Sequence, residues 1–155
     1  MFSQTNEYAL RVITFLAAEP DKSQTNASLA AATKVPSSYL YKILTTLERA
    51  GLVRSQRGKH GGYSLNRPPE ELTVLDVVQA IDPIPRIHNC PLNLKSHGTR
   101  LCPLHKRLDQ TFAMIEKTFR ETVIAELLAD RSSSIPLCEQ KSGGHERRAL
   151  LTITR

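Results

Sequence analysis

Four basic side chains and three glycines are concentrated in one short segment, residues 54–65. The basic residues are Arg54, Arg57, Lys59 and His60. Gly58, Gly61 and Gly62 permit the positive φ angles that a tight hairpin needs. A hairpin with a basic, glycine-rich tip brings backbone and cations to a polyanion together. The chemistry expected of this segment is therefore the binding of phosphate groups.

The outer face of the predicted helix 37–50 carries short hydroxyl groups, phenols and one cation. Its core-facing residues recur at helical spacing and are Leu40, Ile43, Leu44 and Leu47. The residues expected on or near the outer face are Ser37, Ser38, Tyr39, Tyr41, Lys42 and Thr45. Such groups suit phosphates and base edges. An ordinary solvated face is the alternative, but the basic hairpin directly after the helix favours DNA contact.

Thiol and imidazole groups lie in or beside the proline-broken segment 82–101. Cys102 and His105 form a Cys-x-x-His pair at the start of a predicted helix, which gives both side chains a common direction and favours a metal site. Zinc suits the same ligands. Cys90 and Cys102 equally suit a thiol switch, since nearby cations would stabilise a thiolate. A third interpretation, half-buried thiols without a sensing role, also stays open.

The composition favours an anionic partner. The net charge of +6 and the pI near 9.5 favour nucleic acid before membrane. No apolar run approaches the roughly 20 residues that span a bilayer, and the N-terminus lacks the regions of a signal peptide. A cytoplasmic protein is therefore expected. The odd count of three cysteines argues against a secreted disulfide framework.

The elements that must position these groups are mainly helices. Those expected before residue 70 are helix 8–18, helix 26–33, turn 34–36, helix 37–50 and hairpin strands beginning at 52 and 63. Gly51 is expected to end its helix in left-handed geometry. Thr73 and Asp76 predict a capping box on the next helix, which is expected to pack beneath the hairpin.

A long helix beginning at Pro103 carries an apolar stripe. The stripe residues are Leu104, Leu108, Phe112, Ile115 and Phe119. Their spacing is close to a heptad seam, and a lone helix with such a stripe needs a partner, so a homodimer is expected. Thr122 is expected to cap a further short helix through Ala129.

The predicted fold is mainly α with a small β-hairpin. It comprises a winged helix-turn-helix DNA-binding domain (1–82), a sensor loop (83–102), a dimerisation helix region (103–130) and a flexible tail (131–155). Cys138 falls in that tail and is expected to be incidental. A winged helix that serves only as a protein-interaction module is an alternative, and the basic tip argues against it.

A catalytic function is not supported. Cys90 and His88 are the one visible nucleophile–base pairing, and they have no oriented third group or oxyanion donors. The sequence carries no phosphate-binding loop and no dinucleotide fingerprint.

Four segments of the sequence match a known family, in the same order along the chain. They are Glu7–Arg11, Ser38–Leu40, Arg57–Leu65 and Leu72–Ile81. Over about residues 1–130 the chain resembles the Rrf family of bacterial winged-helix regulators, which includes iron–sulfur, nitric oxide and cysteine-metabolism regulators. The resemblance implies a homodimeric transcription regulator, expected to be a repressor, on a roughly two-fold operator in double-stranded DNA. It places helix 37–50 in the major groove and Arg57 at the family's wing arginine.

The resemblance also implies a ligand set for a 2Fe–2S cluster. Cys90 and Cys102 fit the outer cysteine positions of cluster-binding relatives, and His105 fits their histidine. Ser96 replaces the middle cysteine, and a hydroxyl is a poorer iron ligand than a thiolate. Glu7 falls where some relatives supply a carboxylate from the other subunit, and His97 is a further candidate. A regulator without metal stays open.

Overall fold

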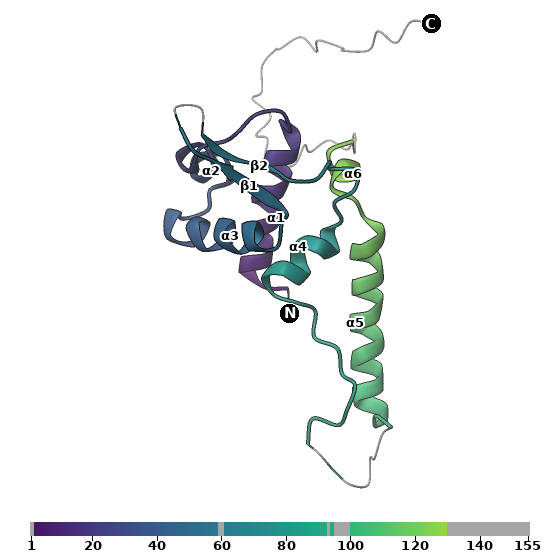
Figure 1. The fold of residues 1–155 in the computed structure, drawn as a ribbon. Coiled ribbons are helices and arrows are strands. Elements are labelled where there is room, and N and C mark those ends of the chain that lie inside the picture. Colours follow the sequence, from purple (N-terminus) through teal and green to yellow (C-terminus); the bar gives the residue numbers. More distant parts are fainter. Residues whose placement is uncertain (1, 59–60, 93, 95–99, 130–155) are drawn as a thin grey trace, which may run out of the picture.

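The computed structural model describes residues 2–58, 61–92, 94 and 100–129. Its elements, in chain order, are α1 (Gln4–Ala18), α2 (Asn26–Thr33), α3 (Ser37–Arg49), β1 (Val53–Gln56), β2 (Gly62–Leu65), α4 (Val74–Ile81), α5 (Pro103–Glu121) and α6 (Ile124–Ala129) (Figure 1). This confirms the predicted class, mainly helical with one two-stranded antiparallel hairpin. The tail after residue 129, and with it Cys138, lies outside the described residues.

Helix α1 begins at Gln4, which is earlier than the predicted start at Tyr8. The hydroxyl of Ser3 accepts a hydrogen bond from the backbone N–H of Asn6, so Ser3 is the N-cap. The apolar stripe of the helix begins later than this cap, which is why hydrophobic periodicity missed the first turn.

The helix-turn-helix follows the predicted ranges closely. α2 is capped by the hydroxyl of Thr25, and Lys34 takes the left-handed conformation in the turn before α3. α3 ends in a Schellman motif: Gly51 N–H donates to Glu48 O, and Leu52 N–H donates to Leu47 O. Gly51 has φ +71°, which confirms the predicted left-handed stop.

The hairpin is tied to the rest of the domain at its second strand. β1 and β2 pair from Val53↔Leu65 to Gln56↔Gly62. Tyr63 then exchanges both backbone hydrogen bonds with Gln24, in the loop between α1 and α2, at 2.8 Å each. A Cβ on Gly62 would lie 2.5 Å from the carbonyl oxygen of Gln24, so only glycine fits this close approach.

The hydrophobic core lies between α1, α3 and α4. Its fully buried members include Val12 and Ile13 of α1, Leu40 and Leu44 of α3, and Val77 of α4. Because these residues recur at helical spacing in the sequence, each helix buries one stripe and leaves its other face exposed. The core therefore fixes which face of α3 points outward.

Helix α4 has the predicted capping box, since Thr73 and Asp76 exchange side-chain and backbone hydrogen bonds. Its predicted position beneath the hairpin was wrong, because it packs chiefly against α1, α3 and α5. α4 is apolar on nearly all sides, and that composition suits a helix enclosed by three others.

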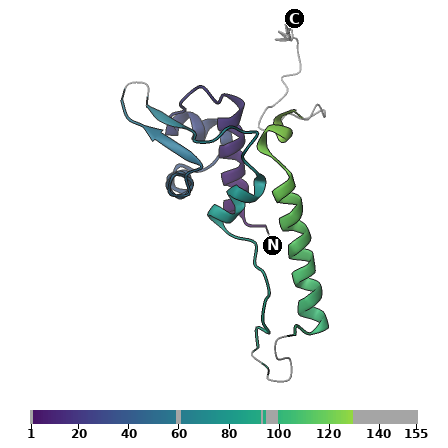
Figure 2. The same cartoon turned by 45° about the vertical axis from the view of Figure 1, so that its right-hand side comes forward.

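The long helix α5 is anchored at its C-terminal end and extends away from the core at the other (Figure 2). Val74 N–H donates to Thr122 O, and Ile124 N–H donates to Leu72 O. The prediction that Thr122 caps α6 was wrong: it is the C-cap of α5, and its hydroxyl donates to Thr118 O. Within the described ranges, no helix has the length and hydrophobicity needed to cross a bilayer.

Candidate nucleic-acid interface and cysteine loop

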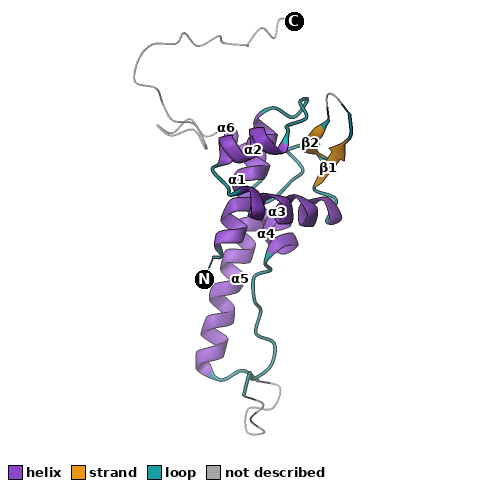
Figure 3. Ribbon diagram, turned by 90° about the vertical axis from the view of Figure 1, so that its left-hand side faces the viewer, coloured by secondary structure: helices purple, strands orange, loops and turns teal. Residues whose placement is uncertain are grey.

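α3 and the hairpin lie on the side of the molecule opposite α5 (Figure 1), and the hairpin stands above one end of α3 (Figure 3). Glu48 of α3 accepts a hydrogen bond from the Ser55 hydroxyl of β1 at 2.5 Å, which links the two elements directly. Val53 is buried beside this link and fixes the base of the hairpin. Helix and hairpin therefore form one continuous surface.

The centre of the exposed α3 face carries two cations. Ser38, Lys42, Thr45 and Arg49 follow one another at spacings of three and four residues, directly opposite the buried leucines. Lys42 and Arg49 are exposed. Arg49 is absent from the sequence-predicted set, although its position seven residues after Lys42 places it on the same line. The helical spacing was the signal that would have found it.

The first backbone N–H groups of α3 have no hydrogen-bond partner among the described residues. Pro36 is the N-cap, and no side chain caps this helix. Tyr39 N–H and Leu40 N–H donate to Pro36 O, so the first backbone N–H groups of Ser37 and Ser38 point outward. A helix N-terminus with free N–H groups attracts phosphate oxygens.

The two predicted tyrosines have different surroundings. Tyr41 is 63% exposed and lies on the hairpin side of α3. Tyr39 lies on the other flank, where its ring meets that of Tyr8 edge-on at 6.1 Å. Arg11 sits over the Tyr8 ring at 5.5 Å. Tyr39 thus also helps to fix α3 against α1.

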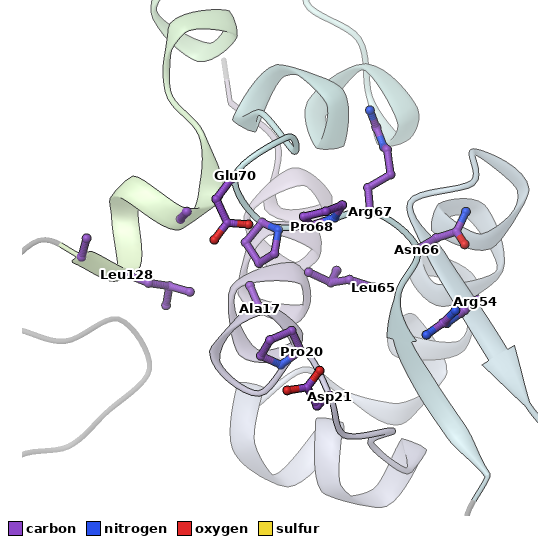
Figure 4. Close-up of a pocket in the computed structure, with 13 residues that line it drawn as sticks. Ala17, Pro20, Asp21, Arg54, Leu65, Asn66, Arg67, Pro68, Glu70 and Leu128 are labelled. Atoms are coloured by element: carbon purple, nitrogen blue, oxygen red, sulfur yellow. The ribbon is translucent and has the colours of Figure 1, made fainter. Parts of the chain in front are cut away.

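Arg54 is placed apart from the other basic candidates. Its Nε donates to the Ser64 hydroxyl at 3.0 Å, and successive strand residues point to opposite faces, so Arg54 and Ser55 diverge. Arg54 borders a pocket of about 690 Å³ together with Asp21, Asn66 and Glu70 (Figure 4). Of Arg54 and Ser55, Ser55 is the one that points toward α3.

The tip of the hairpin is only partly described. Arg57 is exposed and forms no ion pair with any described residue. Gly58 has φ +112°, a conformation that side chains other than hydrogen disfavour. Lys59 and His60 lie outside the described residues.

The structure brings together two of the four metal-ligand candidates. Cys102 Sγ lies 3.3 Å from His105 Nδ1, at the N-terminus of α5. Cys90 is buried, with 6% of its surface exposed. The described part of the chain contains no group of three His, Cys, Asp or Glu side chains arranged to hold a metal ion. Among the described residues, Cys102 and His105 are thus a close pair of donors, whereas a 2Fe–2S centre uses four.

Glu7 lies on α1, where it pairs with Arg11 of the same helix at 2.6 Å. Arg11 also donates to Thr33 O at the end of α2. Glu7 therefore has a structural role within its own chain. Ser96 and His97 lie outside the described residues.

A cluster of ion pairs holds the first part of the cysteine loop, residues 83–102, against α5. Arg86 binds both carboxylate oxygens of Asp109, at 2.7 and 2.9 Å, and reaches Glu116 at 2.9 Å. Ile87 N–H donates to Asp109, and Arg120 pairs with Glu116. We call these side chains, Arg86, Asp109, Glu116 and Arg120, the loop latch.

The ion pairs of the loop latch lower the pKa of each of its two carboxylates. Hydrogen bonds from Arg86, and then from Ile87 N–H, hold the pKa of Asp109 well below its usual range. The hydrogen bond from Arg86 and the charge of Arg120 also lower the pKa of Glu116. Both carboxylates therefore favour their charged form in the folded chain.

Comparisons with known proteins agree with this architecture. The sequence model of the Rrf2 family, described as an iron-dependent transcriptional regulator, matches residues 2–130. The regulator NsrR of Geobacillus kaustophilus is 30% identical over 88% of this chain and 95% of its own length.

Among solved structures, CymR, the global cysteine regulator of B. subtilis, has 22% identity and a TM-score of 0.68, over 82% of this chain and 95% of its own. T. potens IscR has 22% identity and a TM-score of 0.69, over 83% and 85% of the two chains. These two structures support the fold. The match over residues 2–130 confirms the resemblance drawn from the sequence, and the chain belongs to the Rrf2 family of transcriptional regulators.

Proposed function

We propose that this protein is a dimeric, sequence-specific DNA-binding repressor whose operator affinity is set by its Cys/His loop. The observation that carries the proposal is the continuous surface formed by α3 and the hairpin, with the exposed cations Lys42 and Arg49 on the line opposite the core. Membership of a family of transcriptional regulators supports it.

In this proposal α3 enters the major groove. Ser37 and Ser38 bind phosphate through the free N-terminal N–H groups, while Tyr41, Lys42 and Arg49 reach phosphates or base edges. Tyr39 contributes from the flank. Arg57, Lys59 and His60 follow the backbone or the minor groove from the hairpin. Arg54 contributes least, because it points away from α3.

The homodimer is proposed from the exposed stripe of α5. Leu104 is 64% exposed, and Leu108 and Ile115 are also exposed in a single chain. A row of large apolar side chains in water is costly, and burial against a second copy removes that cost. Two copies would also present two α3 helices to a two-fold operator.

Regulation is proposed to act through the loop, because the loop connects α4 of the DNA-binding domain to α5. The latch joins the loop to α5, and the Cys102–His105 pair lies where the loop enters that helix. Oxidation of the Cys102 thiol changes the charge and geometry at this junction. Binding of the same thiol to a cluster that further ligands complete would have the same kind of effect. Movement of the loop would then alter the spacing of the two α3 helices.

The first test is binding to promoter duplex by fluorescence anisotropy across a range of salt concentrations. A specific dimer should prefer operator over random duplex by about a thousandfold or more, and lose affinity steeply with salt. Arg57→Ala should weaken binding and leave the dimer intact. Equal affinity for operator and random duplex would count against a sequence-specific regulator and favour a protein-interaction module.

The second test addresses the loop. Anaerobic purification with an absorption spectrum and iron and sulfide counts distinguishes a cluster from a metal-free thiol. Cys102→Ser should abolish the response of DNA binding to iron removal in the first case and to peroxide in the second. If neither iron removal nor peroxide changes the operator affinity of the wild-type protein, regulation by this loop is refuted.

A further inference from the structure

The pocket of about 690 Å³ at the base of the hairpin has an apolar floor. The end of α1 supplies Ala17, the end of β2 supplies Leu65, and α6 supplies Leu128. The rings of Pro20 and Pro68 lie on either side of Ala17 and Leu65 (Figure 4). Three separate parts of the chain therefore meet at one apolar surface, which we call the hairpin-base pocket.

Charged side chains border this floor. Glu70 lies on the side of α6, because the preceding residue, Pro69, accepts a hydrogen bond from Ala125 N–H of α6 at 3.1 Å. Arg54 comes from β1, and Asp21 comes from the loop after α1. Glu70 is exposed and forms no ion pair with a described residue. The pocket thus suits an occupant that carries a cation at the side of α6 and apolar side chains beyond it.

The chain itself continues from the wall of the pocket. Ala129, the last described residue, lines the pocket. Arg131 follows two residues later, and after three serines come Ile135, Pro136 and Leu137. The eight residues from 130 to 137 reach at most roughly 26–29 Å when extended. This length is enough for the segment to turn back across the pocket.

The order of residue types in this segment matches the pocket. A cation comes first, nearest to α6, and two large apolar side chains follow. Pro136 favours an extended conformation at Ile135, and residues two apart in an extended segment point to the same side. Ile135 and Leu137 can therefore lie on the apolar floor together. Because the segment is tethered at the pocket wall, its effective concentration there is on the order of millimolar, so weak contacts suffice.

We propose that residues 131–137 fold back into the hairpin-base pocket, where Arg131 pairs with Glu70 and the side chains of Ile135 and Leu137 cover the apolar floor. The docked segment joins the end of α1, the base of the hairpin and α6. It thereby braces the hairpin from the side opposite to α3.

The thiol of Cys138 reports this docking, because Cys138 directly follows Leu137. Its rate of alkylation by iodoacetamide is measured in the full chain by peptide mass spectrometry, which separates it from Cys90 and Cys102. The rate for a synthetic peptide of residues 130–145, divided by the rate in the full chain, gives a protection factor. Since mainly the undocked fraction reacts, the wild-type protection factor should be at least about fivefold.

Variants of the full chain separate the two kinds of contact. Glu70→Arg should lower the protection factor about threefold, and adding Arg131→Glu should recover most of the loss. Ile135→Asp should lower the factor to about one, because burial of a carboxylate on the apolar floor is costly. Glu71→Arg makes the same charge change at an exposed neighbour outside the pocket lining, and should stay within about 1.5-fold of wild type.

Each variant peptide carries the same tail substitution as its full chain, so the protection factor excludes changes in the intrinsic reactivity of the thiol. Circular dichroism checks that each variant is folded. A wild-type Cys138 that reacts as fast as the peptide would overturn the inference, and so would equal protection in Glu70→Arg and Glu71→Arg. Protection that falls on dilution of the protein would show that the tail of a second copy fills the pocket, which would also overturn it.

Discussion

At the scale of single residues, α3 combines charge with free backbone donors. Lys42 and Arg49 lie on the line directly opposite the core, and Ser37 and Ser38 offer N–H groups at an uncapped helix start. Each phosphate contact from a cation releases condensed counterions, so in the proposed complex these side chains would contribute both affinity and salt dependence.

Lys42→Ala is therefore expected to weaken binding to operator and random duplex alike, by roughly tenfold at low salt, and to reduce the slope of log affinity against log salt by about one. Fluorescence anisotropy at several salt concentrations measures both quantities. Lys117→Ala removes the same charge from α5, on the far side of the molecule, and should change neither. An unaltered salt slope for Lys42→Ala would remove this residue from the interface.

At the scale of elements, the hairpin depends on its contact with the loop between α1 and α2. A methyl group on Gly62 would meet backbone atoms of Gln24 at 2.5 and 2.7 Å, and backbone yields less readily than a flexible side chain. This contact orients the basic tip relative to α3.

Gly62→Ala is expected to lower the free energy of unfolding by about 1–3 kcal/mol, because the hairpin must separate from Gln24 or strain the backbone. Urea denaturation followed by circular dichroism measures the loss. Gly51→Asn is the matched control: asparagine tolerates φ near +71°, and its Cβ meets nothing within 4 Å, so it should cost much less. Equal losses for the two variants would contradict the steric argument.

The loop latch also acts at the scale of elements. Its ion pairs predict that the stability of the folded chain depends on pH. Because the pKa of Asp109 is depressed in the fold, the stability from this group is present above its unfolded pKa of about 4 and is lost as pH falls toward the folded value.

The stability difference between wild type and Asp109→Asn should therefore be largest near neutral pH and shrink steadily below about pH 4. Thermal unfolding across that range measures the difference. Glu121→Gln, at the exposed end of α5, should show little difference at any pH. A difference between wild type and Asp109→Asn that is constant with pH would show that the carboxylate charge does not hold the latch.

At the scale of the whole molecule, the elements proposed for DNA contact and the helix proposed for dimerisation lie on opposite sides. α3 and the hairpin lie on one side of the molecule, and α5 lies on the other (Figure 1). Two copies joined through α5 can thus both bind DNA, and any change in the angle between them alters the spacing of the two α3 helices.

Ile115→Asp is expected to convert the dimer to monomers, because it places a charge in the middle of the apolar stripe. Sedimentation equilibrium should show the monomer, and anisotropy should show weak affinity that no longer depends on the second half of the operator. Gln110→Asp adds a charge to the same helix away from the stripe and should keep both properties. A monomeric Ile115→Asp with full operator affinity would refute the need for a dimer.

The helical pattern of α1 to α4 was predictable because local signals agreed with the final packing. Apolar spacing identified the buried face of α3, Gly51 identified its end, and Thr73 with Asp76 identified the start of α4. The start of α1 was missed because its cap, Ser3, precedes the apolar stripe. Thr122 was misassigned because one threonine can end one helix or begin the next.

The amino-acid sequence by itself determined the elements, the basic hairpin and the family, because periodicity, glycines and caps act over a few residues. The tertiary structure alone decided that Arg54 turns away from α3, that Glu7 pairs with Arg11 and that Arg86 reaches Asp109 and Glu116. It also decided that Asn6 lines a groove between α1, α4 and α5 and that its buried Oδ1 has no hydrogen-bond partner among the described residues. These features depend on side-chain directions and on segments distant in the chain, which meet only after the core has packed.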